Sequence, residues 1–166
     1  MAYGFGYVWV NQGVQNTKRF LKIFEQRATD CWKQDWHDRV TSRERYSVYR
    51  VFKDVCLQEP YFEVITKKVL RDVFIRFRLG ISDLRTHKLR YSTEPSPDLS
   101  CPLCSTGIDD EKHFLFVCSA TQLLRNRHLS VLSQSDRERQ NFSVLGDTKV
   151  MLSIARFIYH SLKLRI

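Results

Sequence analysis

The sequence predicts a mostly α-helical protein of four to five helices with a small inserted Cys-Cys-His-Cys (CCHC) module. Apolar residues recur at intervals of three and four over several long segments, which is the spacing of one helix face. Only 6 glycines and 4 prolines occur among the 166 residues, which favours long regular elements. Three cysteines and one histidine lie close together within residues 101–118, which indicates a compact metal-binding insertion.

The first fourteen residues are apolar and aromatic, and they predict a short strand or a docking segment rather than the opening of a domain. A helical period then runs from Asn16 to about Val40, with Asn16 or Thr17 as the N-cap. The face of this helix that we expect to be buried carries Phe20, Leu21, Phe24, Ala28, Cys31, Trp32 and Trp36.

A second helix is expected to open at the capping-box sequence of residues 41–44 and to end before Pro60. Its inward residues would be Val48, Phe52, Val55 and Cys56. A third helix is expected over residues 61–79, and Gly80 supplies its stop. Its inward residues would be Ile65, Val69, Val73 and Phe77.

Residues 81–100 are less regular, and residues 92–98 are the only linker-like stretch. After the cysteine cluster, a fourth helix is expected over residues 120–131, a polar break over 133–140, and a last helix over 147–164. The buried residues of this last helix would be Val150, Ile154, Phe157, Ile158 and Leu162. The predicted organisation is an apolar N-terminal segment (1–15), a basic helical region (16–92), the CCHC module (93–120) and C-terminal helices (121–166).

The formal net charge is +9, and most of it falls in one segment. Residues 67–90 carry eight cations and two acids, a net charge of +6. Such density favours a polyanionic partner, above all nucleic acid, because phosphate contacts need no sequence readout. A solvated helix face and a membrane surface are the alternatives. The candidate phosphate-contacting residues are Lys67, Lys68, Arg71, Arg76, Arg78, Arg85, Lys88 and Arg90.

The cysteines and the histidine follow the spacing Cys101-x2-Cys104-x8-His113-x4-Cys118. A Cys-x2-Cys turn can place two thiolates on one tetrahedral Zn²⁺, and the other two residues complete the set. All four positions are then filled, so the sequence predicts one structural Zn²⁺ per chain with no place for a catalytic water. The alternatives are small buried hydrophobic cysteines and a thiol redox pair.

Cys31 and Cys56 lie on the predicted apolar helix faces and are expected in the core. Five cysteines is an odd number, which suits metal binding better than a disulfide framework. The N-terminus has no secretory-signal pattern, and no apolar run is long enough to cross a bilayer. We therefore expect an intracellular protein, nuclear or cytoplasmic, that does not act at a membrane.

Two quoted stretches carry a resemblance: "RFRLG" at residues 76–80 and "CPLCSTGIDDEKHFLFVC" at residues 101–118. Together with the first helix they resemble the C-terminal zinc-binding tail of animal non-LTR (LINE-type) retrotransposon endonuclease–reverse transcriptases, over nearly the whole chain. The resemblance implies that the parent protein performs target-primed reverse transcription and that the tail grips template RNA and target DNA. It also implies that Arg76, Arg78, Arg85, Lys88 and Arg90 lie near phosphates and that Cys101, Cys104, His113 and Cys118 bind the metal.

Enzymatic activity is not expected of this chain. It lacks the Tyr-x-Asp-Asp polymerase motif and the endonuclease motifs, and Asp109 and Asp110 fall in the metal loop. The sequence therefore predicts a non-catalytic, zinc-stabilised module that binds RNA or DNA. The alternative is a protein–protein interaction domain, because residues 3–9 are aromatic and the three tryptophans, Trp9, Trp32 and Trp36, exceed what so small a core needs. Its partner would be the rest of a reverse transcriptase or another protein.

Overall fold

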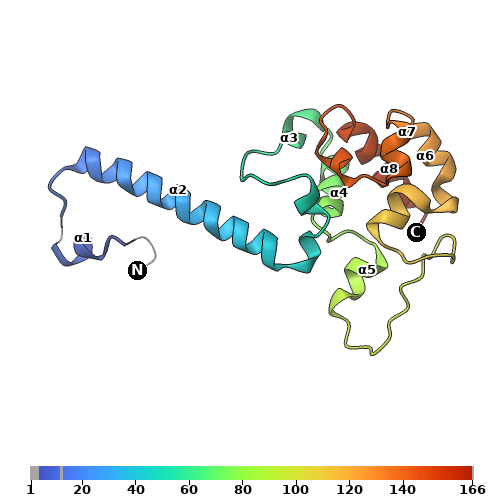
Figure 1. Cartoon of the computed structure of the whole chain (residues 1–166), viewed down its shortest axis with the longest axis horizontal. Helices are drawn as coiled ribbons and strands as arrows, with labels where there is room; N and C mark the ends of the chain where they lie inside the picture. The colour runs from blue at the N-terminus through green and yellow to red at the C-terminus, as the bar shows by residue number, and fades with distance from the viewer. Residues whose placement is uncertain (1–3, 12, 166) are drawn as a thin grey trace. The chain divides into compact units, whose positions relative to one another are not determined.

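The computed structural model describes residues 4–11 and 13–165 (Figure 1). The chain divides into two compact units, Met1–Ser42 and Arg43–Ile166, which are described separately below. Within the described ranges the regular structure is helical, and the only extended pairing is an isolated antiparallel bridge between Ser100 and Ile108. The mostly α-helical prediction with an inserted CCHC module is confirmed.

The first unit contains α1 (Gly6–Asn11) and α2 (Thr17–Ser42). The expectation of a strand near the N-terminus is wrong, because α1 is a helix. The Asn16 side chain accepts a hydrogen bond from the Arg19 amide at 3.0 Å, as predicted for an N-cap. The Phe5 ring packs against Phe20, with ring centroids 5.3 Å apart, so the segment folds onto the start of α2. Tyr3 and the side chain of Trp9 lie outside the described part of the chain.

The predicted apolar stripe of α2 is present but is not a core. Leu21 is 51%, Phe24 40% and Trp32 58% exposed, and Val40 is the buried residue of this helix. Cys31 is only half-buried, and so is Cys56 in the second unit, so neither is the core cysteine that we expected. Helical periodicity predicts an apolar face, but it carries no information on what covers that face.

The predicted second helix is absent from the structure. Its place is taken by two short 3-10 turns, η1 (Glu44–Tyr46) and η2 (Tyr49–Val51), and by an irregular segment up to Pro60. The expected capping box does not form either, because Thr41 is still inside α2 and its hydroxyl donates to the His37 carbonyl at 2.9 Å. The segment after α2 instead surrounds a buried arginine, as described below.

The predicted third helix is divided into α3 (Tyr61–Val64) and α4 (Lys68–Arg78). The break occurs at Ile65, which is fully buried and leaves the helical conformation. Val69, expected inside, is 55% exposed, whereas Phe77 is fully buried as predicted. Gly80 ends α4 with a positive φ of 64° and leaves no room for a side chain against the Arg45 carbonyl, so the predicted stop is confirmed.

The rest of the second unit is a series of short helices followed by one long one. In order, they are α5 (Arg85–Lys88), η3 (Leu89–Tyr91), the π-helical turn η4 (His113–Val117), η5 (Ser119–Thr121), α6 (Gln122–His128), α7 (Gln134–Glu138), η6 (Phe142–Gly146) and α8 (Met151–Lys163). The polar stretch expected to be a break contains α7, whose N-cap Ser133 accepts a bond from the Asp136 amide at 3.1 Å. Nowhere among the described residues is a helix both long enough and apolar enough to span a membrane.

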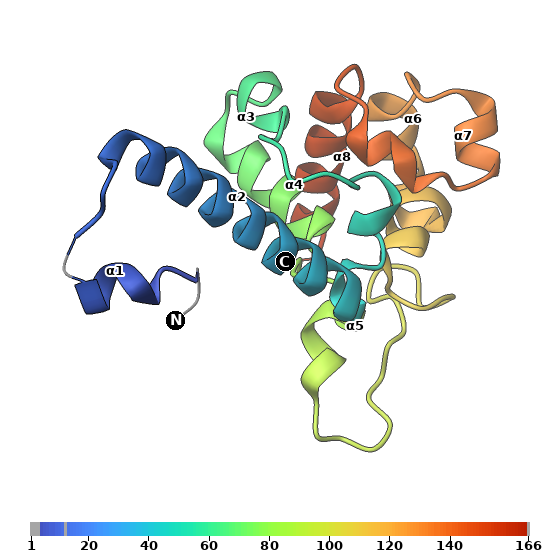
Figure 2. The same cartoon turned by 60° about the vertical axis from the view of Figure 1, so that its left-hand side comes forward.

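The core of the second unit forms where α4 packs against α8 (Figure 2). The rings of Phe77 (α4), Phe114 (η4) and Phe157 (α8) pack in sequence, the first pair tilted and the second edge to face, with centroid separations of 5.6 and 5.7 Å. Ile154 and Ile158 of α8 are fully buried, as predicted. Because Phe114 belongs to the cysteine–histidine segment, the CCHC module shares its hydrophobic core with the helices that flank it.

Candidate metal centre

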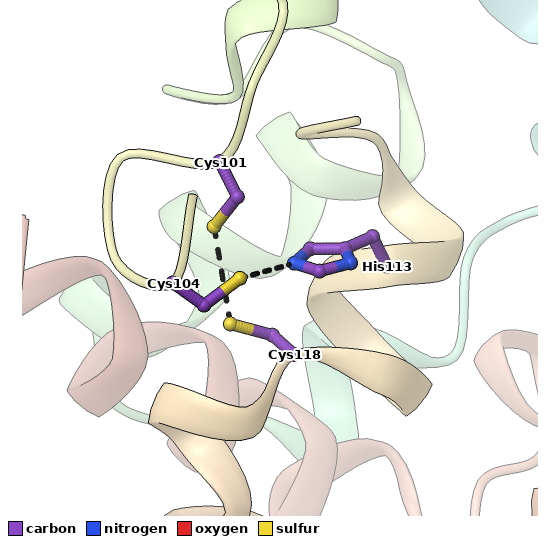
Figure 3. Close-up of side chains that lie close together, drawn as sticks. All are labelled: Cys101, Cys104, His113 and Cys118. Atoms are coloured by element: carbon purple, nitrogen blue, oxygen red, sulfur yellow. Dashed lines mark hydrogen bonds between the residues drawn. The ribbon is translucent and has the colours of Figure 1, made fainter. Parts of the chain in front are cut away.

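Two structural elements present the four predicted ligands (Figure 3). Cys101 and Cys104 lie on a tight loop that is closed by hydrogen bonds from the Cys101 amide to the Gly107 carbonyl, at 2.7 Å, and from the Asp109 amide to the Leu99 carbonyl, at 2.8 Å. His113 and Cys118 lie at the two ends of the π-helical turn η4. Backbone bonds between residues close in sequence therefore shape the loop.

The π-helical turn explains why a separation of five residues suits His113 and Cys118. The Cys118 amide donates to the His113 carbonyl at 2.7 Å, which closes a wider turn than an α-helix allows. At the start of the turn, the Asp110 carboxylate accepts a bond from the His113 amide at 2.7 Å. The His113 ring lies against Gly107, where an added Cβ would approach Nδ1 to 2.8 Å. Gly107 therefore gives the imidazole the space it needs to face the thiols.

The ligand atoms of Cys101, Cys104, His113 and Cys118 all lie within 4.8 Å of one another. The Sγ atoms of Cys101 and Cys118 are 3.8 Å apart, far from the roughly 2.05 Å of a disulfide. Two thiolates about 2.3 Å from one tetrahedral ion would lie about 3.8 Å apart. The Cys104 Sγ is 3.2 Å from the His113 Nε2. The four residues therefore form a cluster compatible with a bound metal ion.

The protein environment shifts the pKa values of the two loop thiols in opposite directions. Burial raises the pKa of the Cys101 thiol to about 11. Burial also acts to raise the pKa of Cys104, but hydrogen bonds from Thr106 and from the neighbouring thiols outweigh it and bring that pKa to about 6. Cys104 is therefore largely a thiolate at neutral pH, and a cation in the cluster would favour the thiolate form of the others.

Arg125 of α6 supports the cluster, and nothing in the sequence pattern indicated this role. Its buried guanidinium donates to the Leu115 carbonyl at 3.0 Å and to the Cys118 carbonyl at 2.9 Å. It thereby fixes the end of the π-helical turn that carries Cys118. A divalent metal held by three thiolates and an imidazole would carry a net negative charge, and the buried Arg125 guanidinium beside it would compensate that charge.

The acidic residues of the metal loop anchor it to the helices. Asp109 is fully buried, accepts from the Arg165 guanidinium at 2.7 Å and also accepts from the Arg85 amide at 2.8 Å. Glu111 contacts the buried His87 at 2.7 Å. These contacts tie the loop to the end of α8 and to the start of α5. The carboxylates of Asp109 and Glu111 are thus engaged in contacts within the protein.

The structure separates the eight candidate phosphate-contacting residues by exposure. Those on the surface are Lys67, Lys68, Arg76 and Lys88, those half-buried are Arg71, Arg85 and Arg90, and Arg78 is buried. Arg90 donates to the Gly80 carbonyl at 2.9 Å, and Arg85 is paired with Asp98. The half-buried arginines therefore already support loops, and the exposed cations are the ones available to a ligand.

Arg78 must be removed from the predicted nucleic-acid surface. Its side chain is 2% exposed and pairs with Glu59 at 2.9 Å. The guanidinium lies among aromatic rings, 4.4 Å from the Phe52 centroid and 5.1 Å from the Tyr61 centroid. The prediction was wrong because the partner carboxylate lies 19 residues away, in a segment that we expected to be helical.

No protein-family model, curated protein or solved structure matches this chain.

Proposed function

We propose that the chain is a non-catalytic nucleic-acid-binding module stabilised by one structural Zn²⁺, and that it derives from the C-terminal tail of a retrotransposon reverse transcriptase. Support for zinc comes from the donor set, because three cysteine thiols and an imidazole whose ligand atoms lie within 4.8 Å of one another suit Zn²⁺ better than hard cations. With all four positions taken by protein ligands, zinc would hold the fold and supply no reactive site.

The observation that carries the nucleic-acid proposal is the set of cations that stay exposed on and beside α4 and α5. Lys67, Lys68 and Arg76 on and beside α4 and Lys88 on α5 remain accessible after folding. Together with the chain's net charge of +9, they favour phosphate binding without sequence readout. Zinc would contribute by holding the loop that Asp109 and Glu111 fasten to the helices.

The test is fluorescence anisotropy of the zinc-loaded chain with labelled single-stranded RNA, single-stranded DNA and duplex DNA over a salt series. We expect binding that falls steeply with salt, and we expect Lys67→Ala with Lys68→Ala to lower the salt slope by about 2, because each lysine neutralises one phosphate. A matched control is the double substitution of two exposed arginines of α7 and its C-terminal end, Arg137→Ala with Arg139→Ala, which also removes two positive charges but lies outside residues 67–90. Absence of binding at low salt would refute the proposal.

A second candidate function, protein–protein interaction, is favoured by the exposed apolar face of α2. Leu21, Phe24 and Trp32 are each at least 40% exposed, which is unusual for large apolar residues on one helix. If this face is the functional surface, Phe24→Ser with Trp32→Ser would abolish partner binding while leaving nucleic-acid affinity unchanged. An affinity that does not depend on salt would also favour this candidate.

A further inference from the structure

A groove of about 610 Å³ lies beside the metal loop in the second unit. One wall comes from Val73 of α4, another from Tyr159 and Leu162 of α8, and a third from Pro102, which lies between the two cysteines of the loop. The metal ligands therefore position one wall directly. These segments are far apart in the sequence, so no local pattern predicts the groove.

The groove is lined by more cations than acids. Its charged residues are Asp83, Arg85, Lys88, Lys163 and Arg165. Lys163 makes no ion pair with any described residue, and its Nζ lies 4.5 Å from the Tyr159 ring centroid. Lys88 pairs with Asp83 at 3.2 Å, but both side chains are at least half exposed, so a phosphate could displace the carboxylate at little cost.

Arg165 provides a buried donor at the same place. Its side chain is 9% exposed and is held by the buried Asp109, while its Nε–H has no acceptor in the described structure. Arg85, which is paired with the exposed Asp98, lines the groove on the side of α5. The groove thus combines fixed guanidinium groups with two exposed lysines, an arrangement that complements an anion.

The remaining surface of the groove is apolar and includes an aromatic ring. Val73, Leu162, Pro102 and the half-buried Tyr159 ring would accept a flat apolar group. A ligand that satisfies both surfaces carries negative charge and exposed planar faces, as a nucleotide does. A duplex keeps its base faces stacked inside, whereas a single strand can place them in a groove. The volume is within the roughly 300–1,000 Å³ of ordinary ligand sites and is too small to enclose a duplex.

We propose that this groove binds one or two unstacked nucleotides of a single strand, with phosphates at Lys88 and Lys163 and a base against the Tyr159 ring. The inference rests on the proposed function and names its substrate class, a single strand rather than a duplex. It also gives α8 a role in binding that lies outside the basic segment of residues 67–90.

The experiment measures anisotropy of the zinc-loaded full chain with a labelled 12-nucleotide strand and with the matching duplex. Lys163→Glu should weaken strand binding about tenfold, because a phosphate contact becomes a repulsion. Lys149→Glu is the matched control: it makes the same charge change at an exposed residue just before α8 that does not line the groove, and should weaken binding no more than about twofold.

The aromatic contact is tested separately at Tyr159. Tyr159→Leu should weaken strand binding about tenfold and leave duplex binding unchanged, whereas Tyr159→Phe should retain strand binding because the ring remains. Melting temperatures of all variants report whether the fold is kept, since Tyr159 also packs against the core.

The outcomes separate the groove from the proposed function. Equal weakening by Lys163→Glu and Lys149→Glu would overturn the groove while leaving general nucleic-acid binding intact. Failure of the wild-type chain to bind any nucleic acid at low salt would overturn both. An anionic lipid headgroup is another phosphate source. If the chain binds phosphatidylserine vesicles in a Lys163-dependent manner and its affinity for the single strand does not change on Lys163→Glu, the groove binds a lipid headgroup and the inference is wrong.

Discussion

Replacing Arg78 with methionine tests whether Arg78 stabilises the fold or binds phosphate. The pair of Arg78 and Glu59 is 2.9 Å long, with side-chain exposures of 2% and 12%. Removing one member of such a buried pair costs about 3–5 kcal/mol, because the other charge is left without compensation. Lys53, 3.4 Å from Glu59, compensates part of that charge, so we expect about 3 kcal/mol. For a chain of this size, this corresponds to a melting temperature lower by about 6–12 °C.

The assay is thermal and urea unfolding followed by circular dichroism, with Arg76→Met as the matched control. Arg76 lies on the same helix but is exposed, so its replacement should change the free energy of unfolding by less than about 0.5 kcal/mol. We expect the opposite for the salt dependence of nucleic-acid binding, measured at a low temperature where both variants are folded. Arg76→Met should lower the salt slope by about 1, and Arg78→Met should leave it unchanged. An unchanged stability of Arg78→Met together with a reduced salt slope would refute the buried role.

Three further predictions address the metal centre and its surroundings. Removing zinc by chelation should lower the melting temperature and the helix content measured by circular dichroism, because small modules of this kind take much of their folding free energy from the metal; unchanged values after verified removal would contradict a structural metal. Arg125→Met should weaken zinc binding about 10- to 100-fold, measured by competition with a chromophoric chelator, because the Cys118 carbonyl loses its guanidinium donor, and Arg125→Lys should restore part of the affinity. Burial, followed by the charges of His160, Arg127 and Arg156, lowers the pKa of His128. The unfolded chain therefore binds this proton more readily, and the contribution of His128 to stability is complete above about pH 6.5 and is lost as the pH falls through the folded pKa. His128→Gln should flatten the decline in the urea midpoint between pH 7 and pH 5, and an equal decline in both proteins would show that His128 does not contribute to it.

Features encoded by neighbouring residues could be predicted from the sequence. The four metal-cluster residues fall within eighteen positions, and the backbone bonds that shape their loop join residues 99–109. The boundaries of α2, the buried face of α8 and the stop at Gly80 follow from periodicity, capping and a positive φ, which are also local. These predictions needed no knowledge of what packs against each segment.

Features that depend on a distant partner could not be predicted. Residues 44–56 have helical spacing of apolar residues, yet they form 3-10 turns and irregular structure instead of an α-helix, and the Tyr49 and Phe52 rings lie beside the Arg78 guanidinium. The enclosing segment and Arg78 stabilise each other in the folded protein. The local sequence around either one does not predict this contact. Arg125 was missed for the same reason, because its acceptors are backbone carbonyls, which every residue has.

Charge counting is the clearest case of this limit, and it bears directly on function. A segment with a net charge of +6 favours a polyanionic partner, but buried carboxylates elsewhere decide which cations can reach it. Arg78 is buried in an ion pair with Glu59, and the cations of residues 67–90 that remain exposed are mainly lysines. The fold also brings Lys163 of α8 to the groove beside Lys88, although the two are 75 positions apart. A nucleic-acid site on this protein is therefore better sought where the fold gathers cations from distant segments around an aromatic ring than along the most basic stretch of its sequence.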